Sequence, residues 1–132
     1  MREEVRSKLL VELSTKNWNP YRIIGFLSDL DLQAQLFNKT EKEALKAVCW
    51  AAGISEDSLK SRDRKDEIVI ARDILFKYHR NKKLSLSSIG KKFNRDHATV
   101  LNGIRRIEND IKTQYPPTMD ILYRINEYFG NE

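Results

Sequence analysis

The fold is decided by residues 85–112, which read SLSSIGKKFNRDHATVLNGIRRIENDIK. Ser85 is a favourable N-cap for a short helix, and Asn94 with Arg95 forms a tight turn after it. Asp96 then caps a second helix that reaches about residue 112. Two helices joined by so short a turn, with a packing helix before them, are typical of a helix-turn-helix.

Helical periodicity continues on both sides of this stretch. Before it, we expect a long helix over about residues 63–80. Its apolar stripe consists of Ile68, Ala71, Ile74, Leu75 and Tyr78. After it, Pro116 and Pro117 interrupt the pattern, and a last helix is expected over residues 119–129.

The N-terminal half also has helical periodicity. It predicts helices over residues 2–13 and 20–38, then a helix opened by the capping box Thr40 to Glu43 and closed by Gly53. A polar connection over residues 54–61 with room for one short helical turn marks a boundary. We therefore predict an all-α helix-turn-helix bundle, divided into an N-terminal helical extension (1–60) and a helix-turn-helix domain (61–132).

Composition excludes several classes of protein. Of the 132 residues, 40% are hydrophobic and 33% charged, which is enough for a core and argues against disorder. No apolar run is long enough to span a membrane, and the opening MREEVRSK predicts no secretory signal. Two histidines and one cysteine give no zinc cluster. We expect a cytoplasmic protein that is not an enzyme and has no metal or other cofactor.

Positive charge gathers in the second half of the chain. Residues 62–112 carry 14 Lys and Arg against 7 Asp and Glu, whereas residues 1–61 carry nine of each kind. A basic segment on a near-neutral remainder indicates an anionic polymer as partner, although a solvated lysine-rich surface has the same composition.

The helix from His97 has two distinct faces. Its core stripe consists of Val100, Ile104, Ile107 and Ile111. The opposite face is small, polar and cationic, and consists of Ala98, Thr99, Asn102, Arg105 and Arg106. Short residues near a helix N-terminus permit close approach to a major groove, and amide and guanidinium groups can read bases or hold phosphates. An ordinary amphipathic helix with two surface arginines is the alternative.

Three stretches are more specific than this pattern. They read SRDRKDEIVIARDILFKYHR from residue 61, LSLSSIGKKF from residue 84 and NRDHATVLNGIRRIE from residue 94. Together they resemble the C-terminal DNA-binding domain of the bacterial replication initiator DnaA, a Trp-repressor-like helix-turn-helix. That family opens its recognition helix with Gly-Arg-Asp-His-Thr-Thr-Val. The resemblance covers about residues 61–112. Ser85 stands where a phosphate-binding loop would need glycine, so no nucleotide site is expected.

The resemblance implies binding to double-stranded DNA. An arginine ahead of the long helix would enter the minor groove, which matches Arg64 with Arg62 beside it. Arg72 in the long helix would also contact DNA, and the start of the first short helix would meet phosphate at Leu86 and Ser87.

The recognition helix would read bases in the major groove with Asp96, His97, Ala98 and Thr99, and Arg106 would approach the backbone. The whole set of expected DNA-binding residues is Arg62, Arg64, Arg72, Leu86, Ser87, Arg95, Asp96, His97, Ala98, Thr99, Asn102, Arg105 and Arg106.

The sequence departs from the family at three positions. Asn94 alone separates Phe93 from Arg95, where the family has two glycines, so the turn is one residue shorter. Ala98 replaces a threonine and donates no hydrogen bond. Asp73 stands where the family often has glutamine, and a carboxylate that faces phosphate would be repelled. These changes leave the target sequence open.

Several residues also have structural interpretations. Asp96 is expected to be an N-cap whatever else it does, and His97 can pack or cap instead of contacting a base. Arg72 can pair with Asp73 or Glu67. The remaining candidates, Trp18, Tyr21, Cys49 and Trp50, are expected in the core.

Two functions fit these observations. The first is sequence-preferring DNA binding in replication control, transcriptional regulation or a mobile element, by a nucleoid-associated protein of bacterial or phage origin. The second is an adaptor that binds a replication protein without reading DNA, although so many arginines on one face favour the first. Residues 1–60 are expected to serve a protein partner or self-association, or simply to pack on the second half.

Overall fold

The computed structural model describes residue 36 and residues 38–130. The helices in this part of the chain are α4 (Glu41–Ala52), the 3-10 helix η1 (Glu56–Lys60), α5 (Asp66–Asn81), α6 (Leu86–Phe93), α7 (His97–Thr113) and α8 (Pro116–Gly130). The described residues contain no strand, which confirms the all-α class. The helices predicted over residues 2–13 and 20–38 fall outside them, apart from Leu36 and Asn38.

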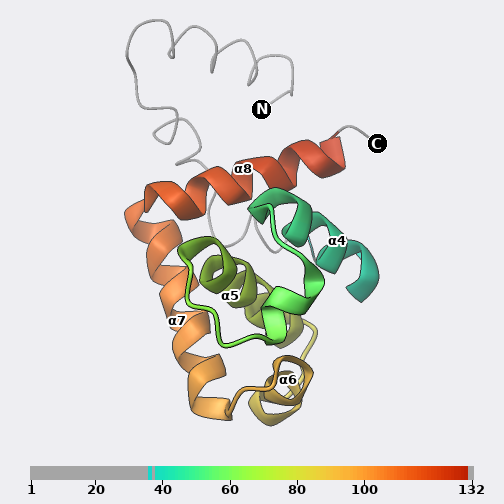
Figure 1. Cartoon of the computed structure of the whole chain (residues 1–132), viewed down its shortest axis with the longest axis vertical. Helices are drawn as coiled ribbons and strands as arrows, with labels where there is room; N and C mark the ends of the chain where they lie inside the picture. Colours follow the sequence, from blue (N-terminus) through green and yellow to red (C-terminus); the bar gives the residue numbers. More distant parts are fainter. Residues whose placement is uncertain (1–35, 37, 131–132) are drawn as a thin grey trace, which may run out of the picture.

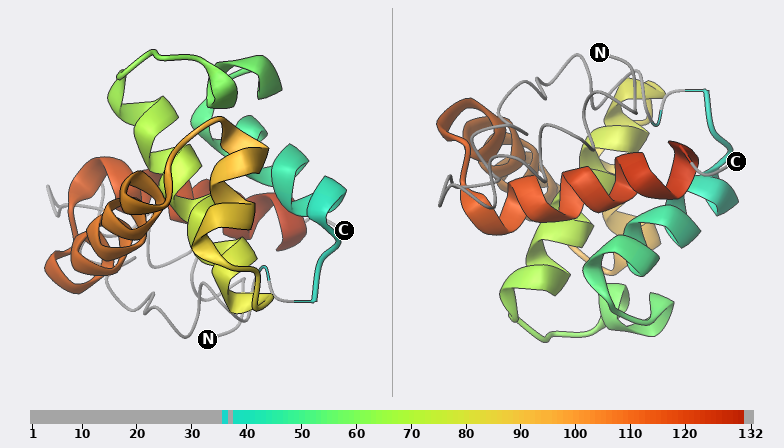
Figure 2. Two further views of the ribbon diagram at one scale, coloured as in Figure 1. Left: turned by 90° about the horizontal axis from the view of Figure 1, so that it is seen from below. Right: turned by 90° about the horizontal axis from the view of Figure 1, so that it is seen from above.

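The central element is α5, which packs against α4, η1, α6, α7 and α8. Figure 1 shows α8 beside α4 at one end of the molecule, α7 along one side, and α6 at the other end. Both views of Figure 2 place α5 between α4 and α7. Ile68 and every residue from 70 to 79 are buried, so α5 is enclosed on nearly all sides.

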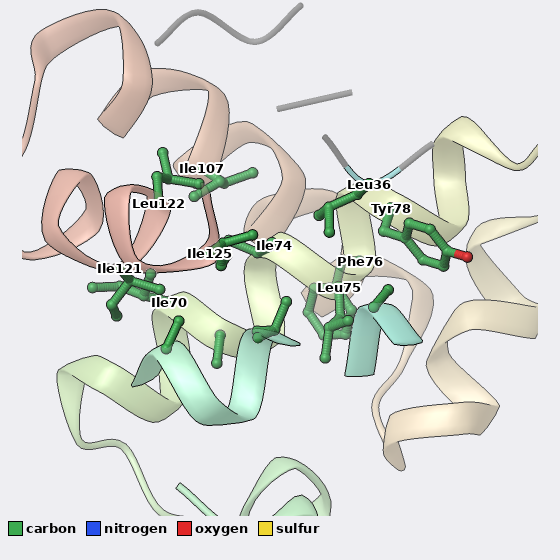
Figure 3. Packing of buried hydrophobic residues seen from close by; sticks show 14 of the residues in the cluster. Leu36, Ile70, Ile74, Leu75, Phe76, Tyr78, Ile107, Ile121, Leu122 and Ile125 are labelled. Carbon is green, nitrogen blue, oxygen red and sulfur yellow. The ribbon is translucent and has the colours of Figure 1, made fainter. Parts of the chain in front are cut away.

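The hydrophobic core forms where α5 meets its neighbours. Ile74 of α5 lies beside Ile125 of α8, and Leu122 lies beside Ile107 of α7, all with 1% exposure or less (Figure 3). The small residues of α4 allow that helix to lie close to α5 and α8: they are Ala44, Ala47, Val48 and Ala51. All five residues of the predicted stripe of α5 are buried.

Two helices begin at residues other than those predicted. The long helix begins at Asp66 rather than Asp63, because the Asp63 carboxylate accepts the N–H of Lys65 at 3.0 Å and holds this segment in a turn. The last helix begins at Pro116 rather than Met119. Proline fits the first turn of a helix, where its missing N–H leaves no bond unmade.

Helix α4 shares the core of the helix-turn-helix. Its capping box is formed as predicted, with the Thr40 hydroxyl accepting the N–H of Glu43 at 3.2 Å, and Gly53 ends it in a left-handed conformation. Tyr78 of α5 donates a hydrogen bond to the Lys39 carbonyl at 2.6 Å just before it. The division of the chain at residue 60 stays a prediction, and this shared packing gives reason to place the boundary before α4.

Two predicted core residues of α4 have different environments. Cys49 is buried as expected, and burial raises the pKa of its thiol to about 11. The prediction for Trp50 was wrong: it is 54% exposed and lies at the surface against Tyr128 of α8, with 5.5 Å between ring centroids. Its position in the helix points away from α5. Trp18 and Tyr21 lie outside the described residues.

Removing α4 should unfold the second half of the chain. We expect a fragment of residues 36–132 to keep a cooperative thermal transition, whereas a fragment of residues 61–132 exposes the apolar surfaces of α5 and α8 that α4 covers and melts far lower or not cooperatively. Circular dichroism melting of both fragments checks this. Equal melting temperatures would show that α4 is dispensable.

Candidate nucleic-acid interface

A tight connection of three residues, Asn94 to Asp96, joins α6 to α7. Asn94 adopts the left-handed conformation with φ of 56°, which asparagine tolerates, and the Arg95 N–H donates to the Gly90 carbonyl at 2.8 Å. A Cβ atom on Gly90 would overlap the carbonyl oxygen of Arg95, so only glycine permits this close approach. The turn therefore closes without the extra residue that the resemblance led us to expect.

The recognition helix starts immediately after this turn. The Asp96 carboxylate accepts the Thr99 N–H at 2.7 Å, which confirms it as the N-cap and lowers its pKa. His97 and Ala98 are exposed, and Thr99 is half-buried. The packed alternative for His97 is therefore wrong. The first turn of α7 presents short side chains to solvent, as reading a groove requires.

The segment at residues 61–64 is held against this turn by two arginines. Arg72 is 6% exposed, and its guanidinium donates to the carbonyls of Leu59 at 2.9 Å and of Ser61 at 3.2 Å. Arg95 also donates to the Ser61 carbonyl and to that of Phe93 at 3.1 Å. Arg62 and Arg64, which follow this anchor, are exposed.

This geometry changes the role expected for Arg72. Its hydrogen bonds go to backbone carbonyls, not to Asp73 or Glu67, and its side chain is buried behind the segment that it holds. Burial, and next the positive charge of Arg95, lower its pKa. Arg72 positions Arg62 and Arg64 and does not itself project from the surface.

Asp73 joins α5 to the recognition helix. It is 1% exposed, and its two carboxylate oxygens accept from Nε of Arg106 at 2.7 Å and from Nη2 at 3.0 Å. The expectation that Asp73 faces phosphate was wrong, because Arg106 covers it. Burial raises the pKa of Asp73 to about 6, although the hydrogen bond and charge of Arg106 act in the opposite direction.

These elements surround a cleft of about 680 Å³ between the 62–64 segment and the N-terminal half of α7. Five arginines and two aspartates are among its lining residues, so its charge is strongly positive. The full lining is Arg62, Asp63, Arg64, Val69, Arg72, Asn94, Arg95, Asp96, Thr99 and Arg106.

The remaining predicted residues lie on surfaces outside the cleft. Asn102 and Arg105 are exposed on α7, Ser87 is exposed in the first turn of α6, and Leu86 is half-buried there. Sequence reasoning missed three lining residues, Asp63, Val69 and Asn94. Asn94 was interpreted only as a turn residue, and α5 was interpreted only for its apolar stripe, to which Val69 does not belong.

Other kinds of site are not supported by the part of the chain that the structure describes. Within it, no three His, Cys, Asp or Glu side chains are placed to hold a metal ion. None of its helices is long and apolar enough to cross a membrane.

Comparison with known proteins identifies similar sequences. Residues 42–107 match the family described as "Bacterial dnaA protein helix-turn-helix", which takes in nearly all of α4 and the predicted region as far as residue 107. The chain is 39% identical over 83 residues to the chromosomal replication initiator protein DnaA of Oleidesulfovibrio alaskensis, covering 62% of this chain and 18% of that protein. The chain is 30% identical over 118 residues to the DnaA of Mycoplasma pneumoniae, and this match covers 82% of this chain and 26% of that protein. The chain thus spans about a fifth to a quarter of these relatives' length. No solved structure matches it significantly.

Asp73 should make stability depend on pH. Its folded pKa of about 6 lies above the ordinary value of 3.8, so the unfolded chain releases the proton first as pH rises. The contribution of Asp73 to folding stability therefore falls between about pH 4 and pH 6, by roughly 2–3 kcal/mol, and is constant above that. Urea unfolding of the wild type and Asp73→Asn checks this, with exposed Asp57→Asn as control. A difference between wild type and Asp73→Asn that does not vary with pH would contradict it.

Proposed function

Because the chain belongs to the bacterial DnaA helix-turn-helix family, we propose that it binds double-stranded DNA with a sequence preference. The first turn of α7 enters the major groove, and the 62–64 segment reaches the neighbouring minor groove. The observation that carries this proposal is the arginine-lined cleft between those two elements. It is the place where a phosphate strand between the two grooves would run.

Each wall of the cleft supports one part of this arrangement. Arg62 and Arg64 are exposed on a segment without helical structure, and arginine side chains favour the negative potential of a narrow minor groove. On the other wall, Ala98 and Thr99 permit close approach to base edges, and Asn102 and Arg105 continue the exposed face of α7. Ser87 is exposed in the first turn of α6, and the N-terminus of a helix suits a phosphate.

We assign Arg72 and Arg95 a supporting role within the binding site. Both guanidinium groups meet at the Ser61 carbonyl, so they fix where Arg62 and Arg64 leave the protein surface. Arg95 is half-buried and keeps a face on the cleft, where its charge adds to the attraction for phosphate.

The biological role that we propose is non-enzymatic control of replication, since the similar proteins are named as replication initiators. Transcriptional regulation and a mobile-element function use the same DNA-binding chemistry. The protein would then act on the bacterial nucleoid.

An adaptor function is favoured by one separate feature. Trp50 is largely exposed and packs on Tyr128, and their helices α4 and α8 lie side by side (Figure 1). An exposed tryptophan beside a tyrosine suits a protein interface. This surface is away from the cleft, so a protein partner and DNA can bind together.

Binding to DNA should weaken steeply with salt. About 4–6 phosphate contacts give a slope of log K against log salt of roughly −4 to −5. Fluorescence anisotropy with a labelled random duplex, at salt concentrations from about 50 to about 200 mM, measures this slope. An adaptor that does not bind DNA would give no signal at low salt or a slope near zero.

Arg64→Ala and Thr99→Ala should have different effects on a site selected from a random library. Loss of Arg64 should weaken binding most where the flanking sequence is A/T-rich. Loss of the Thr99 side chain keeps the cap, which uses the backbone N–H, and should cost about 1–2 kcal/mol at one base position.

Arg124→Ala is the matched control, because Arg124 is an exposed arginine of α8 outside the cleft. If Arg64→Ala and Thr99→Ala leave the affinity as unchanged as the control does, the DNA-binding site lies elsewhere on the molecule.

A further inference from the structure

We propose that Asp73 is a specificity-determining residue for DNA, acting through Arg106 without touching the nucleic acid. By holding one edge of the Arg106 guanidinium, it directs the other edge to a single phosphate position and weakens the attraction of the cleft for DNA of any sequence. This inference rests on the proposed DNA-binding function.

Asp73 and Arg106 differ in exposure. The Asp73 side chain is 2% exposed, so DNA cannot reach it, whereas that of Arg106 is 49% exposed and lines the cleft. A change at Asp73 therefore reaches DNA through the position and net charge of Arg106.

Arg106 keeps N–H groups that Asp73 does not use. A guanidinium has five, and Asp73 accepts one from Nε and one from Nη2. The two at Nη1 and the second at Nη2 remain, and one from each nitrogen forms the end-on fork that binds a phosphate through two parallel bonds. With its side-on edge held in two places, the guanidinium plane is fixed before DNA arrives.

The Asp73 carboxylate also defines the position of α7. Gly103 lies one turn before Arg106, and a Cβ atom there would come within 2.6 Å of Asp73 Oδ1 and of Phe76 Cδ2. The recognition helix thus lies directly on Asp73, and both the helix and its arginine are fixed by one side chain.

The Asp73 carboxylate neutralises the charge of Arg106. Paired with Asp73, Arg106 adds no net charge to the cleft, while its free N–H groups still donate to a phosphate in the right place. Without the carboxylate, Arg106 becomes a mobile cation that attracts any backbone. Specificity is the difference between two affinities, and this arrangement lowers the affinity for the wrong sequence.

The electrostatics of the pair support this interpretation. The charged groups acting on Asp73 are Arg106 and Asp110 of α7 and its neighbour Arg72, and their combined effect does not offset burial, since the pKa is raised. The ionised pair therefore does not stabilise the fold. Buried ion pairs of this kind contribute more to a defined geometry than to stability.

The test compares a selected site with a random duplex of the same length. We expect Asp73→Asn to bind the random duplex about 3–10-fold more tightly, with a salt slope steeper by about one phosphate contact. The ratio of specific to random affinity should fall by at least about 5-fold. Asp120→Asn makes the same charge change on α8, outside the cleft, and should leave that ratio unchanged.

A second measurement uses pH. Between about pH 7.5 and 5.5, protonation of Asp73 in the wild type should raise its random-duplex affinity toward that of Asp73→Asn, while the comparison of the two proteins cancels every pH effect that both share. If Asp73→Asn lacks a cooperative thermal transition, the smaller Asp73→Ser is used in the same way.

Each outcome decides the proposal. An Asp73 variant that folds but binds both duplexes more weakly by the same factor would show a merely structural role and overturn it, as would an unchanged ratio. A wild type that binds no duplex at all would instead refute the proposed function, so the two failures are distinguishable.

Discussion

A helix that is enclosed on nearly all sides has little solvent-facing surface for its charged side chains, and this constraint acts on α5. Four of its acidic or basic residues are 8% exposed or less: Arg72, Asp73, Lys77 and His79. A buried charge without a partner is far more costly than a buried apolar group. Each must therefore find a partner in the element packed on it or lose its charge. For His79, burial lowers the pKa and favours the neutral imidazole, although the Glu41 carboxylate, 3.8 Å from its Nε2, acts in the opposite direction.

The partners of the other three connect the core to α7 and to the segment before α5. Arg72 holds the backbone of the segment that carries Arg62 and Arg64, and Asp73 holds Arg106. Lys77, one turn further along α5, donates to Glu108 of α7 at 2.8 Å. Two ion pairs one helical turn apart fix the rotation of α7 about its own axis, which apolar contacts between Ile side chains would specify less sharply.

The sequence was sufficient to predict the local structure and insufficient to predict these pairings. The caps Thr40, Ser85 and Asp96 and the apolar stripe of α5 follow from short-range rules, and the structure confirms them. Read alone, however, polar residues at positions 72, 73, 77 and 79 look like a solvated face. Burial of that face depends on η1, α6 and α7, and periodicity within one helix carries no information about its neighbours. Trp50 is the opposite case: as a large aromatic residue it was expected in the core, but its position on α4 exposes it at the surface.

The shortened turn shows why family-level residues do not by themselves define the site. With Asn94 as the only residue between Phe93 and Arg95, the backbone returns at once, and the Arg95 side chain comes within reach of the Ser61 carbonyl. That carbonyl also accepts from Arg72, so the start of α7 and the 62–64 segment share one anchor point. The distance between the start of α7 and the 62–64 segment is consequently set by contacts of this chain's own residues. In the proposed complex with DNA, the preferred sequence follows from that spacing and from Ala98 and Asp73 together, because identical side chains presented from a different frame meet different base pairs.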